Sequence, residues 1–203
     1  MENEAAMSKA EYFASEIYSV LHDFAWVFAI TVIVFTFLVR LVAVDGSSMF
    51  PTLVDRDYLC LLSNAVCGDY EQGDVVVATV PSFSSKTIVK RVIATEGQVV
   101  NIDFDAGVVY VDGTPLDEPY TFAPTHVNYP YGMDYPLTVP EGCVFLMGDN
   151  RNHSTDSRYA GIGPVDTRNL IGKVLTVTIP GSQTNEYGEI VAPRKWKRIG
   201  IVR

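Results

Sequence analysis

The segment GSSMFPTL at residues 46 to 53 places a glycine, two serines and a proline within a few positions of one another. Gly46 and Pro51 favour a sharp turn of the backbone, which would expose a serine hydroxyl together with its own amide. A serine hydroxyl attacks a carbonyl carbon only when a nearby base removes its proton. The segment can therefore present a nucleophile, although the same residue types also make ordinary turns.

Histidine is the first residue type to consider as the base, and the sequence contains three. His22 precedes a long apolar run, and His126 lies in a stretch rich in proline and tyrosine. Neither has neighbours that suggest a catalytic triad. His153 lies in a polar segment and is the only histidine whose surroundings suit this role.

Lysine offers a second route to a base, as in serine-lysine hydrolases. Lys90 lies in the apolar segment 87–93, where the alternation of a β-strand places Ile88, Lys90 and Val92 on one face. Burial on that face would lower the lysine pKa from about 10.4 and make the neutral amine available near neutral pH. Taken alone, the segment fits a lysine that protects a strand edge better than it fits a base.

A third group of polar residues, GDNRNHSTDSR at residues 148 to 158, directly follows the apolar run CVFLM. Asp156 could form an ion pair with Arg158 or Arg151, and Ser154 could hydrogen-bond and orient a lysine amine. A solvated loop and an acidic calcium loop are the alternatives. The spacing of the acidic residues does not match the EF-hand pattern, so we expect no metal.

An apolar run at residues 24–44, interrupted only by Arg40, lies immediately before the first of these segments. A helix of this length would span roughly 30 Å, the thickness of the hydrocarbon core of a bilayer. We expect a single transmembrane helix at 24–44, preceded by an N-terminal segment at 1–23. A cleaved signal sequence is disfavoured because the preceding residues are acidic. The few cations at either end leave the orientation of the helix open.

After residue 44, short runs rich in valine, isoleucine, tyrosine and threonine alternate with turn residues. This pattern is typical of a mainly antiparallel β domain. Asp112 and Gly113 predict a hairpin turn, and the prolines and tyrosines of 116–140 predict an extended loop. The expected strands are 58–62, 74–80, 87–94, 98–103, 107–111, 143–147 and 171–179.

The chain has a formal net charge of -9 at pH 7 and lacks the basic stripe that binding to nucleic acid requires. Basic residues gather only at 193–203, around Trp196. Contact with anionic lipid headgroups and an ordinary solvated terminus both explain that tail. The three cysteines are too few for a disulfide scaffold and lack the spacing of metal ligands. A bridge between Cys60 and Cys67 remains open.

In their order along the chain, these segments resemble the characteristic sequence motifs, or boxes, of bacterial type I signal peptidases. The form that they resemble is the one common in Gram-positive bacteria. The resemblance covers most of the chain after residue 44 and is highly specific. It rests on GSSMFPTL at 46–53, GDVVV at 73–77, KRV at 90–92, GDNRNHSTDSR at 148–158, GPV at 163–165 and IGKV at 171–174.

The resemblance implies a serine-lysine dyad in which Ser48 is the nucleophile and Lys90 is first the general base and then the general acid. Ser154 would orient the Lys90 amine, while an ion pair between Asp156 and Arg158 would hold the last box in shape. The Ser48 amide would donate to the oxyanion, an interaction worth roughly 3 kcal/mol per donor.

Some members of this family carry a serine two residues before the nucleophile, whereas this chain has Gly46 at that position. That serine supplies a second oxyanion donor, so the second donor is not identified by the resemblance. Eukaryotic relatives use histidine as the base, whereas the KRV box with Lys90 indicates the bacterial form. We therefore expect His153 to be a polar loop residue.

The resemblance also implies a mainly β fold: an antiparallel catalytic domain of signal-peptidase type at 45–203, with a β insertion at about 96–142, after one transmembrane helix. The N-terminus would lie in the cytoplasm and the catalytic domain on the extracytoplasmic side of the cell membrane. The implied enzyme is a monomeric serine endopeptidase without cofactor or metal. It would act at the lipid bilayer and remove signal peptides that end in a small-x-small sequence from exported preproteins.

Two other functions stay open. A different serine-lysine peptidase with the same core, such as a self-cleaving repressor, is disfavoured by the predicted anchor, because such repressors are cytosolic and carry a DNA-binding region. A membrane-tethered β-sheet binding protein without activity would tolerate the replacement of Ser48 or Lys90.

Overall fold

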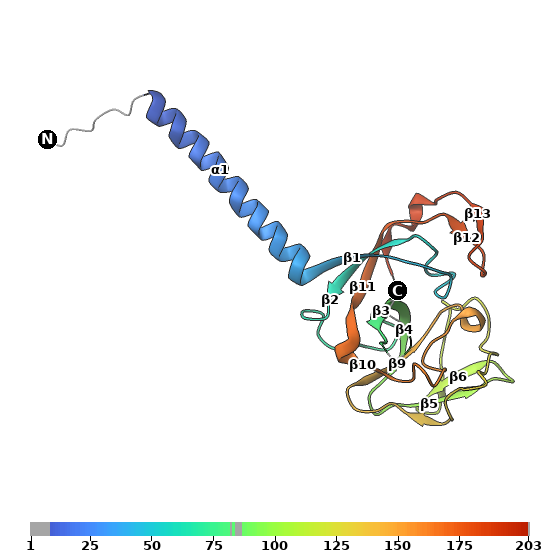
Figure 1. Ribbon diagram of the computed structural model, residues 1–203. Helices are drawn as coiled ribbons and strands as arrows, with labels where there is room; N and C mark the ends of the chain where they lie inside the picture. Colours follow the sequence, from blue (N-terminus) through green and yellow to red (C-terminus); the bar gives the residue numbers. More distant parts are fainter. Residues whose placement is uncertain (1–8, 82, 84–86, 203) are drawn as a thin grey trace. The chain divides into compact units, whose positions relative to one another are not determined.

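The computed structural model describes residues 9 to 81, 83 and 87 to 202 (Figure 1). The chain divides into two compact units, Met1–Val39 and Arg40–Arg203. The described part of the first unit is mainly helical, and the second unit consists mainly of antiparallel strands. The predicted fold class, a mainly antiparallel β domain preceded by one apolar helix, is therefore confirmed.

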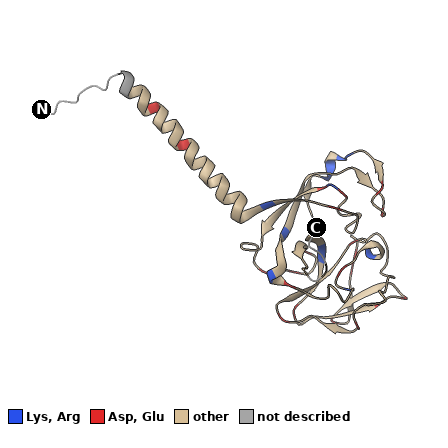
Figure 2. Cartoon of the chain, viewed as in Figure 1, with Lys and Arg blue, Asp and Glu red and all other residues tan. Residues whose placement is uncertain are grey.

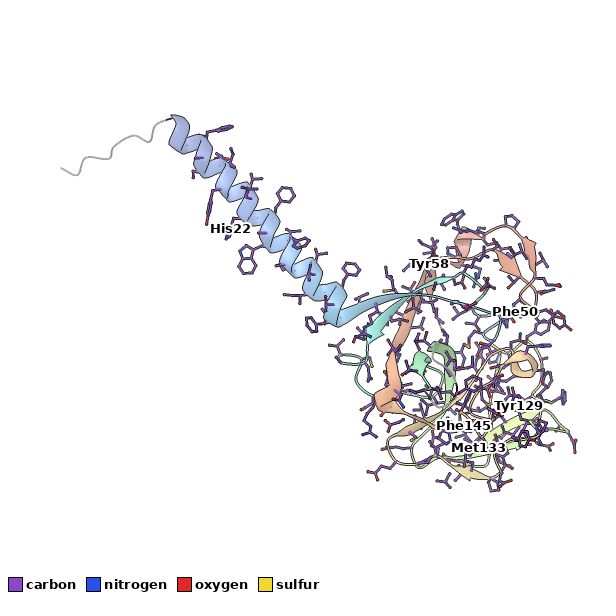
Figure 3. The ribbon with its side chains drawn as sticks, in the orientation of Figure 1. His22, Phe50, Tyr58, Tyr129, Met133 and Phe145 are labelled. Atoms are coloured by element: carbon purple, nitrogen blue, oxygen red, sulfur yellow. The ribbon has the colours of Figure 1, made fainter. Side chains whose placement is uncertain are left out.

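The helical unit consists of α1 (Lys9–Ile33), which ends in one π-helical segment, η1 (Val34–Leu38). Residues Tyr12–Leu38 are long and apolar enough to cross a membrane, and none of the window that qualifies is buried. Side chains such as His22 project from the helix on all sides (Figure 3), and a long part of it carries no charge (Figure 2). A helix that is apolar all round and unburied needs an apolar solvent, which a bilayer supplies.

The helix begins and ends earlier than the expected range of 24–44. It starts at Lys9, and the backbone becomes extended at Val39, where strand β1 (Val39–Ala43) begins. Val44 is buried in the core of the β unit, and its amide donates to the Asp57 carbonyl over 2.8 Å. Val44, the last residue of the run, therefore belongs to a protein core, and Val42 packs against the same core. Hydropathy cannot separate the two cases, because a membrane and a core reward the same side chains.

The larger sheet of the second unit brings together strands from both ends of the chain. In this sheet, every strand pair with assigned residue partners is antiparallel. All of the expected strands in this sheet are present to within two residues. The order is β1, β2 (Tyr58–Ser63), β11 (Leu170–Ile179), β3 (Val75–Thr79), β4 (Thr87–Thr95), β9 (Cys143–Met147) and β10 (Val165–Asp166), and β14 (Gly200–Ile201) also pairs with β11.

A second, four-stranded sheet lies within the expected insertion. Its order is β7 (Thr114–Pro115), β6 (Val108–Val111), β5 (Val99–Asp103) and β8 (Leu137–Thr138). Asp112 and Gly113 both have positive φ, 52° and 77°, which is the geometry of the predicted hairpin turn. Most of 116–140 has no regular structure, as expected. Short elements complete the chain: β12 (Gln183–Thr184), β13 (Ile190–Ala192) and the 3₁₀ turns Arg151–His153, Thr167–Asn169 and Trp196–Arg198.

The small sheet shares a hydrophobic core with the large one. Val100 and Val109 of the small sheet pack with Ile93 of β4 and with Phe145 and Met147 of β9, and all five side chains are fully buried. This shared core fixes strands β4 and β9, which border the site described below. Cys60, Cys67 and Cys143 are free thiols, so no bridge joins Cys60 to Cys67.

Gly172 lets strand β11 lie close to β2. A Cβ atom there would overlap the backbone carbonyl oxygen of Leu62, which cannot move without separating the two strands. We expect Gly172→Ala to lower the free energy of unfolding by about 1–3 kcal/mol. Urea denaturation of the detergent-solubilised chain measures this. Leu175→Ala, at an exposed position of the same strand, is the control and should change stability by less than about 0.5 kcal/mol. Equal stability of the two variants would contradict the close approach.

Candidate active site

Ser48 lies in the loop between β1 and β2, at residues 44 to 57. The turn around it is closed by the Phe50 amide, which donates to the Ser47 carbonyl over 3.0 Å. Met49 and Leu53, with 1% and 0% exposure, anchor the loop in the core. Gly46 has φ of +106°, a conformation that other residues rarely adopt. These contacts anchor the loop in the core of the β unit, and the Ser48 side chain faces the site.

The amine of Lys90 donates a hydrogen bond to Ser48 Oγ over 2.7 Å and a second to the Val89 carbonyl over 2.9 Å. Lys90 is 4% exposed and lies on β4, between β3 and β9. A lysine that protects a strand edge keeps its ammonium in water, whereas this side chain is buried. The edge-lysine interpretation is therefore wrong, and the structure brings the predicted pair into direct contact.

Burial lowers the pKa of Lys90 to about 8, because the ammonium loses its hydration. The carboxylates of Asp156 and Asp149 act in the opposite direction, and Arg158 adds to the lowering. A pKa near 8 leaves a minor but usable fraction of the neutral amine at neutral pH. Such an amine can accept the proton of Ser48.

Asp156 and Arg158 form the expected ion pair. The Arg158 guanidinium donates to both carboxylate oxygens of Asp156, over 2.8 and 2.9 Å, and both side chains are buried. Burial alone would raise the pKa of Asp156, but Arg158 and the amide of Gly148 reverse this and hold the pKa below its usual value. A buried carboxylate is thereby kept charged beside Lys90.

The Ser154 hydroxyl donates to Asp156 Oδ2 over 2.8 Å. Within the described ranges, no hydrogen bond joins it to the Lys90 amine, so its role in orienting that amine stays a prediction. Gly148 explains how closely these residues approach one another: a Cβ there would overlap both the Ser154 side chain and the Ser48 carbonyl oxygen. Ser154 therefore lies directly against the nucleophile turn.

Arg91 and Asp149 form a second buried pair that the sequence did not indicate. The guanidinium donates to both oxygens of Asp149, over 2.8 and 2.6 Å, and the ring of Tyr120 covers it at 4.0 Å. Thr52, in the nucleophile loop, donates to the same carboxylate over 2.5 Å. The pair thus joins β4, the polar segment 148–158 and the loop that carries Ser48.

The extended loop 116–140 supplies further partners to the polar segment. Arg151 pairs with Glu118, with one contact at 2.8 Å, and not with Asp156. Tyr129 donates to the Ser154 carbonyl and lies against Arg158, with 5.5 Å between the guanidinium carbon and the ring centre (Figure 3 labels Tyr129). The loop has no periodic pattern, so only its acidic and aromatic residues could have signalled this role.

Among the described residues, the amide of Ser48 donates no hydrogen bond, so it is available to a developing oxyanion. The Gly46 amide already donates to Asp55 Oδ1 over 2.9 Å. Gly46 is therefore engaged in holding the loop and is not placed to supply the second donor.

Among the described residues, the three histidines form hydrogen bonds with neither Ser48 nor Lys90. The His153 ring packs edge to face on Tyr187, with 4.9 Å between ring centres, and His126 Nδ1 contacts the Phe104 carbonyl. His22 contacts Trp26 on α1. Over the ranges that the structure describes, no cluster of three or more potential metal ligands occurs.

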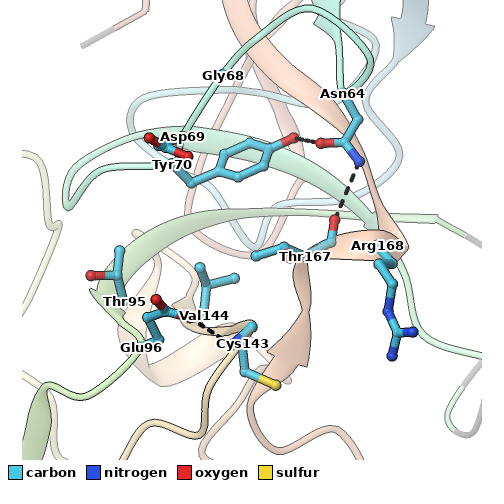
Figure 4. Close-up of a pocket in the computed structure, with 11 residues that line it drawn as sticks. Asn64, Gly68, Asp69, Tyr70, Thr95, Glu96, Cys143, Val144, Thr167 and Arg168 are labelled. Atoms are coloured by element: carbon cyan, nitrogen blue, oxygen red, sulfur yellow. Dashed lines mark hydrogen bonds between the residues drawn. The ribbon is translucent and has the colours of Figure 1, made fainter.

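Several hollows of about 310 to 440 Å³ open on the β unit, and two of them contain a serine or cysteine that could act as a nucleophile. One, of about 400 Å³, contains the dyad; it is lined by Ala43, Val44, Asp45, Ser48, Met49, Thr87, Ile88, Val89 and Lys90. The other, of about 430 Å³, includes Tyr70, whose hydroxyl donates to Asn64 over 2.7 Å (Figure 4). Its cysteine, Cys143, has its pKa raised by burial and stays a thiol. Of these two hollows in the described part of the chain, only the one with the dyad places a serine against a buried amine.

Comparison with known proteins places this chain in a family. The family model described as signal peptidase, peptidase S26, matches residues 17–179. A probable signal peptidase I-1 of Synechocystis sp. is 36% identical over 153 residues, which cover 71% of this chain and 74% of the relative. Signal peptidase I S of Bacillus subtilis is 33% identical over 144 residues, covering 68% of this chain and 75% of the relative.

A solved structure is also similar: the crystal structure of a signal peptidase I from Enterococcus faecalis V583 has 31% sequence identity and a TM-score of 0.41, covering 52% of this chain and 96% of that chain. The family model spans most of the chain, including every box quoted above. The chain belongs to the signal peptidase family, peptidase S26.

Proposed function

We propose that this protein is a membrane-bound serine endopeptidase that removes N-terminal signal peptides from exported preproteins. The observation that carries the proposal is the 2.7 Å hydrogen bond between the buried Lys90 amine and Ser48 Oγ. Membership of the signal peptidase family and relatives named signal peptidase I support the substrate class.

In the proposed reaction the neutral amine of Lys90 takes the proton of Ser48 as the hydroxyl oxygen attacks the scissile carbonyl carbon. The Ser48 amide donates to the oxyanion of the tetrahedral intermediate. Lys90 then returns the proton to the leaving amine, which is the new N-terminus of the mature protein. Lys90 next deprotonates a water molecule that attacks the acyl-enzyme, and the proton passes back to Ser48.

Ser154, Asp156 and Arg158 support the dyad in this proposal without touching the substrate. The Asp156 carboxylate accepts from the Gly148 amide over 2.9 Å and from the Ser154 hydroxyl, which fixes the turn against the Ser48 carbonyl. We propose that Ser154 thereby orients the Lys90 amine.

The proposal places the helix, within Tyr12–Leu38, across the cell membrane as a single anchor, with the residues before the span in the cytoplasm and the catalytic domain outside, beside the bilayer. The insertion at about 96–142 forms a satellite part of that domain. Ser48 and Lys90 both come from one chain, so a monomer is sufficient. Because a signal peptide ends where it leaves the membrane, an anchored enzyme meets the cleavage site, expected to follow a small-x-small sequence.

Replacement of either member of the dyad tests the mechanism. We expect Ser48→Ala and Lys90→Ala each to lower kcat for preprotein cleavage in detergent micelles by at least about 1,000-fold. Lys173→Ala, which removes a partly exposed lysine paired with Asp74, is the matched control and should retain activity. Thermal unfolding checks that all variants are folded. Substantial cleavage by a folded Ser48→Ala or Lys90→Ala variant would rule the dyad out.

The pH dependence tests the burial of Lys90. Only the neutral amine can accept the Ser48 proton, and its pKa is lowered to about 8. The rate should therefore rise about tenfold per pH unit below pH 8 and level off above it. The pH profile of kcat/KM on a preprotein measures this. A midpoint near 10, the pKa of a solvated lysine, would contradict a buried base.

A further inference from the structure

The C-terminal segment at 180–202 lies beyond the range matched by the family model, yet it contacts the loop that carries Ser48. Among the cations of this segment, Arg194, Lys195 and Lys197 are exposed to solvent. Arg198 differs, because its side chain is turned inward and is 18% exposed. Of the cations that the structure describes between 193 and 202, Arg198 is therefore the one committed to a contact inside the protein.

Arg198 binds the far end of the nucleophile loop with both arms of its guanidinium. Nη1 donates to Asp57 Oδ1 over 2.8 Å, and Nη2 donates to Asp57 Oδ2 over 2.7 Å. Nη2 also donates to the Thr52 carbonyl over 3.1 Å. Asp57 is completely buried and Arg198 is 18% exposed, so this two-armed ion pair is largely shielded from water.

Asp57 in turn closes the loop. Its carboxylate accepts from the Val54 amide over 2.8 Å and from the Gly181 amide over 2.6 Å. Its carbonyl accepts from the Val44 amide over 2.8 Å, which joins the first and last residues of the loop. Ser48 lies between these two points, so the position of Asp57 determines where the loop can place it.

The same C-terminal segment reaches the other side of the turn. The Asn150 side chain donates to the Glu186 carbonyl over 2.8 Å and to the Ser47 carbonyl over 3.1 Å. The Asn150 amide donates to the Ser48 carbonyl over 3.0 Å. The segment thus contacts both supports of the nucleophile turn, Asp57 and Asn150.

We propose that the C-terminal segment holds Ser48 at its distance from Lys90 and that Arg198 is the positioning residue through which it does so. Loss of Arg198 would leave the buried Asp57 carboxylate without its counter-charge and the Thr52 carbonyl without this donor. The loop would then shift. Displacement of a reacting group by about 1 Å can lower a rate by about 100-fold. The effect on catalysis rests on the proposed function, whereas the effect on the loop does not.

The test compares Arg198→Ala, Arg198→Lys and Arg168→Ala in the full chain in detergent micelles. Arg168 is a matched control, because it also binds a carboxylate, Asp166, with a two-armed contact, but at the surface. For Arg198→Ala we expect kcat per folded molecule to fall about 10- to 100-fold, with KM changed less than about twofold. Arg198→Lys should recover part of the rate, since lysine keeps the charge but not the two-armed geometry.

Two further readouts separate positioning from general stability. The midpoint of the pH–rate profile should stay near 8 in Arg198→Ala, because the charges that act on Lys90 are Asp156, Asp149 and Arg158. Hydrogen exchange at the amides of Val44 and Val54 should become faster in Arg198→Ala and not in Arg168→Ala.

An unchanged kcat per folded molecule in Arg198→Ala, or an equal loss in Arg168→Ala, would overturn the proposal. Unchanged exchange at the two amides would overturn it even if the wild type cleaved no preprotein. A wild type that does not cleave preproteins would instead refute the proposed function, while the exchange result would still decide whether Arg198 holds the loop.

Discussion

The rest of the catalytic unit depends on one constraint, which is the burial of the Lys90 amine within hydrogen-bonding distance of Ser48. A buried ammonium is unfavourable, and this is what lowers the pKa of Lys90 to about 8. Lys90 lies where β4 enters its pairing with β9, which begins at Arg91, so this part of the sheet has to be held rigidly. The shared core between the two sheets supplies that rigidity, since Phe145 and Met147 of β9 are fully buried beside β4.

A second consequence of the burial of Lys90 is that the ion pairs around its amine are also buried. Arg91 pairs with Asp149, and Arg158 pairs with Asp156, in each case through two-armed contacts between buried groups. Burying ion pairs seldom adds stability compared with apolar residues of the same size. Their value here is geometric, because the Arg91–Asp149 pair joins β4 to the polar segment 148–158 and the Arg158–Asp156 pair fixes the shape of that segment. The carboxylates also keep the Lys90 pKa from falling further, which preserves a base that can be reprotonated during the reaction cycle.

The nucleophile loop shows the same use of buried charge. Asp149 accepts from Thr52 and Asp57 accepts from Val54 of this loop, and each carboxylate binds an arginine from elsewhere in the chain, Arg91 and Arg198. Ser48 has few contacts of its own, and its position follows from these anchors. The loop can therefore expose its serine to a substrate and still keep a 2.7 Å contact with the base.

The sequence by itself determined the features that depend on local pattern: the apolar helix, the strands and the hairpin at Asp112, because side-chain alternation and turn residues act over short distances. The order of the boxes along the chain also identified Ser48 as the expected nucleophile and Lys90 as the expected base. The tertiary structure alone decided that Lys90 lies on an interior strand, that Arg151 pairs with Glu118, that the helix gives way to β1 at Val39 and that Arg198 reaches the nucleophile loop. Each of these depends on contacts between distant segments, and neither periodicity nor hydropathy records which distant segment a residue will meet.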